Sequence, residues 1–119
     1  MKKICRWLLV TGVTLSTVNL SWAADVPEAV EVNVINHEFN PSVIHLKAGV
    51  ETSISVHNQD LMPIEFESTE LSREVVVLGH RTAHFTLGPV EAGEYHFFND
   101  LNHSMKGTIV VTNKDTGGK

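Results

Sequence analysis

Apolar and polar residues alternate with a period of two in short runs through most of the chain beyond residue 23. Val30, Val32 and Val34 alternate with polar neighbours, and Ile54 and Val56 do so again. Successive side chains of a strand point to opposite faces, so this alternation indicates strands with one buried face. About eight short strands are expected, near residues 30–34, 42–47, 50–57, 63–67, 74–78, 82–87, 94–98 and 108–112.

Turn-forming residues separate these runs, among them Asn40-Pro41, Ala48-Gly49 and Glu91-Ala92-Gly93. No segment has the pattern of a long helix. Short strands joined by such turns predict an all-β fold, an antiparallel β-sandwich formed by one domain over residues 24–119. Residues 115–119 are polar and glycine-rich, and we expect them to form a frayed tail.

The first 23 residues have the pattern of a secretory signal peptide. Three basic residues precede a mostly apolar stretch over 7–20, and Ser21 and Ala23 place small side chains before a cleavage point at Ala24. The apolar stretch is too short for a spanning helix, although a membrane anchor is the alternative reading. We therefore expect export to the periplasm and no membrane insertion of the mature chain.

Removing this segment changes the charge and the thiol content. Three of the nine basic residues and none of the fourteen acidic residues lie in 1–23, so the formal net charge falls from −5 to −8. The single cysteine, Cys5, is also lost. An acidic domain without a basic patch does not suit nucleic acid and is better suited to cations. No nucleophile motif or glycine-rich phosphate loop is present, so we expect no enzyme activity.

Four stretches carry a family resemblance: "FNPSVIHLKAGV", "NQDLMPIEFES", "GPVEAGEYHFF" and "MKGTIVV". In this order they resemble the cupredoxin-like domain family, and most closely the cupredoxin-like module of EfeO-type periplasmic iron-uptake proteins. The resemblance covers roughly residues 30–111. It implies a Greek-key sandwich with metal chemistry at the end where loops 60–63 and 99–105 meet.

The chain departs from the blue-copper pattern within this family. Blue-copper sites use two histidines, a cysteine and a weak axial methionine. The resemblance places the first histidine at Ile64 and the cysteine at Asn99, whereas His103 and Met105 match the second histidine and the methionine. Without a thiolate, a type 1 blue copper centre is not expected.

The chain also departs from the EfeO-type modules. These often carry cysteines at the positions of Phe39 and Asn99, and this chain has neither. It keeps their glutamate at Glu65, and it has His96 where they often place an acidic residue.

One candidate site is the set Met62, His103 and Met105, which the resemblance places in the two loops. Thioether sulfur together with imidazole prefers the soft ion Cu(I). The alternative is that the methionines only fill gaps in the core and the histidine is solvated.

A second candidate is the strand face that carries Glu65, Glu67 and His96, with Asp100 as a possible addition from the adjoining loop. Residues two apart in a strand share a face, so the two glutamates point together while Phe66 points to the core. The resemblance places the strand of His96 beside them. Carboxylates with imidazole suit iron, Zn(II) or Cu(II). Outward strand positions are commonly polar in any case, which is the alternative.

The other histidines show no ligand-pair spacing and are read as surface residues: His37, His45, His57, His80 and His84. The leading hypothesis is a periplasmic protein that binds copper and/or iron in support of bacterial iron uptake. Its partner would be an inner-membrane iron permease or another component of that system. A copper carrier or sensor unrelated to iron, and a metal-free interaction module, are the alternatives.

Overall fold

The computed structural model describes residues 18–19 and 28–113, and this part of the chain contains nine β-strands and no helix. The all-β prediction is confirmed. The strands are β1 (Glu28–Ile35), β2 (Glu38–Asn40), β3 (Val43–Lys47), β4 (Thr52–Asn58), β5 (Ile64–Ser68), β6 (Arg73–Val77), β7 (Thr82–Leu87), β8 (Gly93–Asn99) and β9 (Asn102–Thr112).

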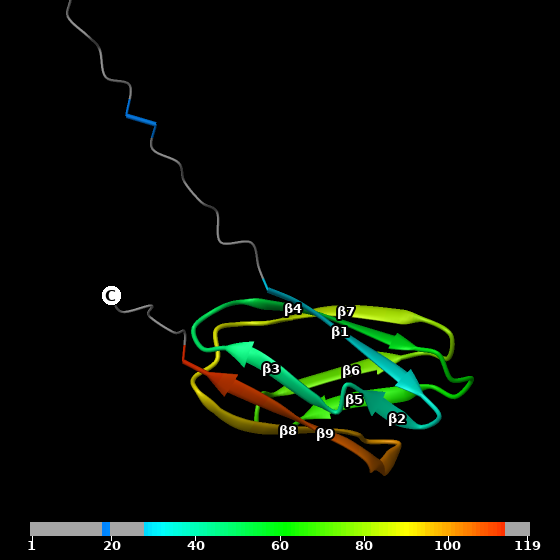
Figure 1. The fold of residues 1–119 in the computed structure, drawn as a ribbon. Coiled ribbons are helices and arrows are strands. Elements are labelled where there is room, and N and C mark those ends of the chain that lie inside the picture. The colour runs from blue at the N-terminus through cyan, green and yellow to red at the C-terminus, as the bar shows by residue number, and fades with distance from the viewer. Residues whose placement is uncertain (1–17, 20–27, 114–119) are drawn as a thin grey trace, which may run out of the picture.

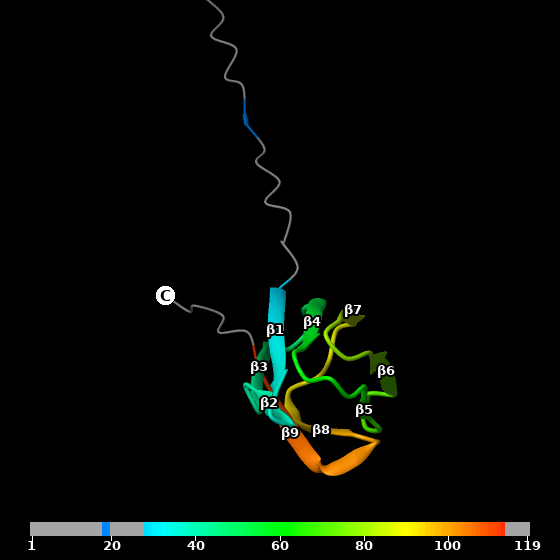
Figure 2. The same ribbon diagram turned by 90° about the vertical axis from the view of Figure 1, so that its right-hand side faces the viewer.

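The strands form two sheets that face each other (Figures 1 and 2). One sheet has the order β2-β1-β4-β7, and the other has the order β3-β9-β8-β5-β6. Two neighbouring pairs, β1 with β4 and β3 with β9, run parallel, so the sandwich is not purely antiparallel as expected. Parallel neighbours need a crossover; between β1 and β4 the chain crosses to the other sheet to form β3.

Two other features differ from the expected strands. The short strand β2 pairs with β1 and was not predicted. Strand β9 begins at Asn102, six residues before the expected start, so most of the expected loop over 99–105 belongs to a β8–β9 hairpin. The pairing register shifts between Phe98 and Asn99. This irregularity decides which way the side chains near the hairpin tip point.

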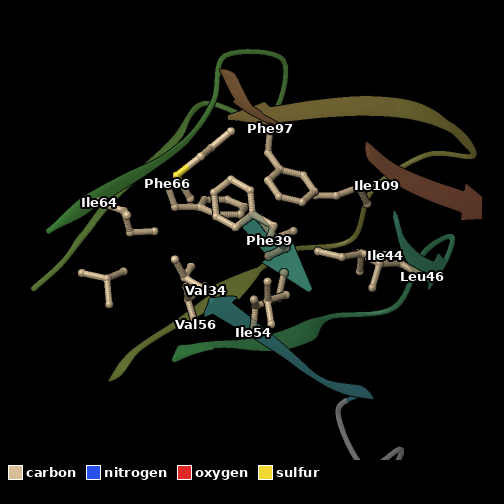
Figure 3. Close-up of a cluster of buried hydrophobic side chains, with 14 of the residues drawn as sticks. Val34, Phe39, Ile44, Leu46, Ile54, Val56, Ile64, Phe66, Phe97 and Ile109 are labelled. Carbon is tan, nitrogen blue, oxygen red and sulfur yellow. The ribbon is translucent and has the colours of Figure 1, made fainter. Parts of the chain in front are cut away.

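The core lies between the sheets and is centred on three phenylalanine rings (Figure 3). Phe66 and Phe97 stack with centroids 4.9 Å apart, and Phe39 meets Phe97 edge-on at 5.0 Å. Burying a side chain of this kind contributes roughly 1.5–3 kcal/mol. Valines and isoleucines of β1 and β4 pack beneath the rings, as the alternation predicts.

No helix in the described residues has the length and hydrophobicity needed to cross a bilayer. The expected signal peptide, apart from residues 18 and 19, and the tail 115–119 lie outside the described residues.

Candidate metal centre

Asn99 ends β8 at the position where the resemblance expects a thiolate, and its side chain is fully engaged. Its Oδ1 accepts hydrogen bonds from the backbone N–H groups of Glu65 (2.9 Å) and Leu101 (3.1 Å). Its Nδ2 donates to Met105 Sδ at 3.4 Å. Asn99 is only 3% exposed. The amide therefore joins β5, the hairpin tip and Met105, and its oxygen is already occupied by two donors.

A second buried asparagine, Asn58, orders the segment that leads to Met62. Its Nδ2 donates to the carbonyl oxygens of Met62 (2.8 Å) and Val77 (3.2 Å). Its Oδ1 accepts from the backbone N–H of Asp60 at 3.1 Å. Because these bonds join β4, the following loop and β6, they fix where Met62 lies at this end of the sandwich.

Asp60 holds the turn between β1 and β2. Its Oδ2 accepts from the backbone N–H of His37 (2.8 Å) and its Oδ1 from that of Asn36 (2.9 Å). Both turn residues have left-handed backbone conformations, with φ of 53° and 62°. The His37 hydrogen bond, followed by the smaller contribution from Asn36, lowers the pKa of Asp60 despite partial desolvation. The His37 Nδ1 lies 3.7 Å from Asp60 Oδ2, so the imidazole stays beside this carboxylate.

These groups meet at a cavity of about 230 Å³ between the loop ends. Met62 and Met105 both line it, together with His37 and Asp60. Met105 is 3% exposed and Met62 is 61% exposed, so one sulfur is inside the fold and the other is at the surface. The cavity thus gathers two thioethers, an imidazole and a carboxylate.

His103 does not join the two methionines. Its Nε2 is 2.9 Å from Asp100 Oδ1, and its ring meets the ring of Phe98 edge-on at 5.3 Å. It lines a different hollow, of about 600 Å³, on the outer face of the five-stranded sheet together with His96. The candidate set of Met62, His103 and Met105 is therefore not brought together: His103 and Met105 both belong to β9, near the register shift of the hairpin, but they line different hollows.

The second candidate face is only partly assembled. Glu65 and Glu67 alternate with the buried Phe66 along β5, and β8 is the neighbouring strand, as expected. His96, however, pairs with Glu70, with Nδ1 2.9 Å from Oε1. Asp100 pairs with His103. The imidazole expected to join Glu65 and Glu67 is thus engaged with another carboxylate.

The carboxylates themselves lie close together. A hydrogen bond with Glu74 is the main cause that raises the pKa of Glu65, and desolvation and the charges of Glu74, Asp100 and Glu67 add to it. Glu67 stands opposite Glu74 across β5 and β6. This face is therefore a cluster of carboxylates that repel one another when ionised.

Within residues 28–113, no three His, Cys, Asp or Glu side chains are already arranged to hold a metal ion. Sequence reasoning took His37 for a surface residue, less firmly than the other histidines because it lies near a loop end, and its side chain is indeed 66% exposed. It did not consider Asp60. The available signal was the Asn36-His37 pair between two apolar runs, since asparagine and histidine are enriched in left-handed turns.

The comparison with known families agrees with this architecture. The model of the cupredoxin-like domain matches residues 6–111. The chain belongs to the cupredoxin-like domain family. An uncharacterized protein of Rickettsia prowazekii (strain Madrid E) is 27% identical over 84 residues, which are 71% of this cupredoxin-like chain and 67% of the relative.

Solved structures show the same fold. The metal-binding domain of the Cu(I)-exporting P-type ATPase CopA of Streptococcus pneumoniae D39, solved with Cu(I), has a TM-score of 0.64 at 17% identity, covering 71% of this chain and 84% of that domain. Auracyanin A, a "blue" copper protein of Chloroflexus aurantiacus, has a TM-score of 0.63 at 15% identity, covering 73% of this chain and 100% of its own. Amicyanin of Paracoccus versutus has a TM-score of 0.58 at 22% identity, covering 74% and 86%. At these identities the likeness concerns the fold.

Proposed function

We propose that this cupredoxin-like protein is exported to the periplasm and binds Cu(I) at the cavity between Met62 and Met105. The observation that carries the proposal is that the only two methionines beyond residue 1 line one cavity with His37. Thioether sulfur with imidazole suits Cu(I) better than harder ions. Asp60 adds a negative charge that favours a cation there.

The chemistry of the cavity favours a carrier over an electron-transfer centre. A blue centre needs a thiolate, and the Asn99 amide at that position is committed to three hydrogen bonds. The similar CopA domain was solved with Cu(I), and auracyanin A is described as a blue copper protein, so copper chemistry occurs on this fold. We assign no catalytic step to the chain.

A role in bacterial iron uptake is the second part of the proposal. Its support is the resemblance to EfeO-type modules and the carboxylate cluster around Glu65, whose repulsion a hard cation such as iron would relieve. The partner would be an inner-membrane iron permease or another component of that system. Exposed apolar side chains at the cavity end, Leu61 and Leu101 among them, offer a surface for docking.

The copper site is tested by titrating Cu(I) against a competing chelator. Met105→Leu and Met62→Leu keep an apolar side chain but remove the sulfur, and both should weaken Cu(I) binding strongly, as should His37→Ala. His103→Ala is the matched control, because His103 lines the other hollow. Undiminished binding in both methionine variants would refute the site, and a loss confined to His103→Ala would reassign it.

Thermal unfolding tests whether binding is specific. At an ion concentration about 100 times the Kd, binding adds roughly 2.7 kcal/mol, and each kcal/mol moves the Tm of such a domain by about 4–8 °C. Cu(I) should therefore raise the Tm by at least roughly 10 °C.

The double variant Glu65→Gln with Glu67→Gln should lose any rise in Tm caused by Fe(III) and keep the rise caused by Cu(I). If no ion shifts the wild type, a metal-free interaction module replaces the proposal.

A further inference from the structure

Two histidines on the outer face of the four-stranded sheet are held in the same way. His84 Nδ1 lies 2.8 Å from Ser55 Oγ, and His57 Nδ1 lies 2.8 Å from Thr82 Oγ1. Each pair stands directly opposite across the antiparallel strands β4 and β7. Both hydroxyls therefore engage Nδ1 and leave Nε2 as the free nitrogen of each ring.

A carboxylate stands beside these rings. Glu31 on β1 is opposite Ser55 on β4, so Glu31, Ser55 and His84 form one row across three strands. His57 is the next outward residue of β4 after Ser55, and its Nε2 lies 3.9 Å from Glu31 Oε1. The Glu31 side chain is 76% exposed and free to rotate.

The geometry of the sheet places the long side chains of Glu31, His57 and His84 around the short side chain of Ser55. Neighbouring strands lie about 4.8 Å apart, so the Cα atoms of Glu31 and His84, two strands apart, are separated by roughly 9–10 Å. The Cα atom of His57 lies about 6.7 Å from that of Ser55 along β4. Ser55 lies at the centre and carries only a short hydroxymethyl group, whose Oγ bonds to His84 Nδ1. The side chains of Glu31, His57 and His84 are long enough to converge there.

The distances and donors suit a borderline divalent ion. Zn–N and Zn–O bonds of about 2.0–2.2 Å separate two tetrahedral ligand atoms by roughly 3.4 Å, slightly less than the 3.9 Å between His57 Nε2 and Glu31 Oε1. Metal-binding imidazoles usually hold their other nitrogen in a hydrogen bond that fixes the tautomer. Both imidazoles here have Nδ1 in a hydrogen bond with a hydroxyl, which can accept from Nδ1–H and leave the lone pair of Nε2 for a metal.

We propose that His57, His84 and Glu31 form a site for a divalent transition-metal ion of the Zn(II) class. Their hydrogen bonds orient His57 and His84, and Glu31 has to rotate to complete the site, because no three-ligand group in the described residues is already arranged to hold a metal ion. Arg81 lines the adjoining hollow with Glu31 and His57, and its positive charge opposes the binding of a cation there. The site contains no sulfur and is independent of the proposed Cu(I) cavity.

The test is a calorimetric titration of the purified chain with Zn(II). His57→Ala and His84→Ala should each lower the affinity by about 100-fold, and Ser55→Ala and Thr82→Ala by about tenfold, since hydrogen-bond partners of metal ligands have effects of 10–100-fold. His45→Ala, on the other sheet, should change nothing. The double variant Met62→Leu with Met105→Leu should keep full Zn(II) affinity.

Each opposite result overturns the proposal. Equal losses in His45→Ala and His57→Ala would mean scattered binding by surface histidines. Full affinity in Ser55→Ala and Thr82→Ala would show that the hydrogen bonds from these hydroxyls to Nδ1 contribute nothing to Zn(II) binding. Unchanged melting of the metal-free variants confirms that they fold, and ¹⁵N chemical shifts of the histidine rings report directly whether Zn(II) occupies Nε2 of His57 and His84.

Discussion

At the scale of single residues, Asn99 decides what the end of the sandwich can do. Its three hydrogen bonds hold the β5 backbone, the hairpin tip and Met105 in place. Asn99→Ala leaves backbone donors without their acceptor, so we expect a loss of about 1–3 kcal/mol in the free energy of unfolding. Urea denaturation measures it. The matched control is Asn113→Ala, at an exposed position directly after β9, which should stay within about 0.5 kcal/mol of the wild type.

Asp60 makes the stability of the metal-free protein sensitive to acid. Backbone N–H groups, first that of His37, lower its pKa from 3.8, so the folded state prefers the ionised form. This contribution is fully present above the ordinary pKa of 3.8 and is lost as the pH falls through the lowered value. Asp60→Asn should therefore lower stability at neutral pH and reduce the loss in acid. Parallel stability–pH curves for the two proteins would contradict this.

The pKa of Glu65 is shifted in the opposite direction to that of Asp60. Its hydrogen bond with Glu74 and the surrounding carboxylates raise its pKa above 4.5, so its stabilising contribution is present below that value and is lost as the pH rises. Ionised Glu65 then repels Glu74, Asp100 and Glu67. Glu65→Gln should raise the unfolding midpoint of the metal-free protein at neutral pH and have no such benefit at acid pH. A variant less stable than the wild type at neutral pH would exclude this repulsion.

At the scale of elements, the hairpin of β8 and β9 brings Asn99, Leu101 and Met105 to the cavity. Gly107 on β9 sits opposite Phe97, and a Cβ there would overlap Phe97 Cζ and lie 2.5 Å from the Ser42 carbonyl oxygen. Phe97 stacks on Phe66 and meets Phe39, so it has no room to move. Gly107→Ala should cost about 1–3 kcal/mol, measured by thermal or urea unfolding.

Gly88 provides the control for that change. A Cβ at Gly88 meets nothing within 4 Å, so Gly88→Ala should leave stability nearly unchanged. Equal effects of the two substitutions would show that backbone freedom, and not the packing of Phe97, explains the glycine at position 107.

At the scale of the whole molecule, the two sheets present separate chemistry. The cavity at the loop end holds sulfur, the outer face of the five-stranded sheet holds carboxylates, and the outer face of the four-stranded sheet holds paired histidines. The faces are separated by the phenylalanine core (Figure 3). An ion bound at one of them would therefore have little direct influence on the others.

The mature chain should contain no thiol and should not form a blue copper centre. The expected cleavage before Ala24 would remove Cys5, the single cysteine, and leave copper without a thiolate ligand. Mass spectrometry of protein from the periplasm should show a chain that starts at Ala24, and its Cu(II) form should lack the intense blue charge-transfer band. A strong blue colour, or an intact Cys5, would contradict this.

The alternation of apolar and polar residues predicted most of the strands and their buried faces, but not β2 or the first half of β9. Phe66 points inward between Glu65 and Glu67, and the fully buried Phe97 follows an exposed His96. This is expected because successive side chains of a strand point to opposite faces of the sheet. The buried positions of Ile64 and Asn99 likewise agree with that pattern.

Only the tertiary structure decided which strands pair and in what register. The parallel partners β1 and β4, and the shift between Phe98 and Asn99, depend on hydrogen bonds between distant segments. The alternation within one strand does not depend on which strand lies beside it. It also stays the same when the pairing shifts by two residues, so it cannot determine the partner or the register. The placement of His103 apart from Met105, of His37 beside Met62, and of His57 near His84 follows from those long-range pairings.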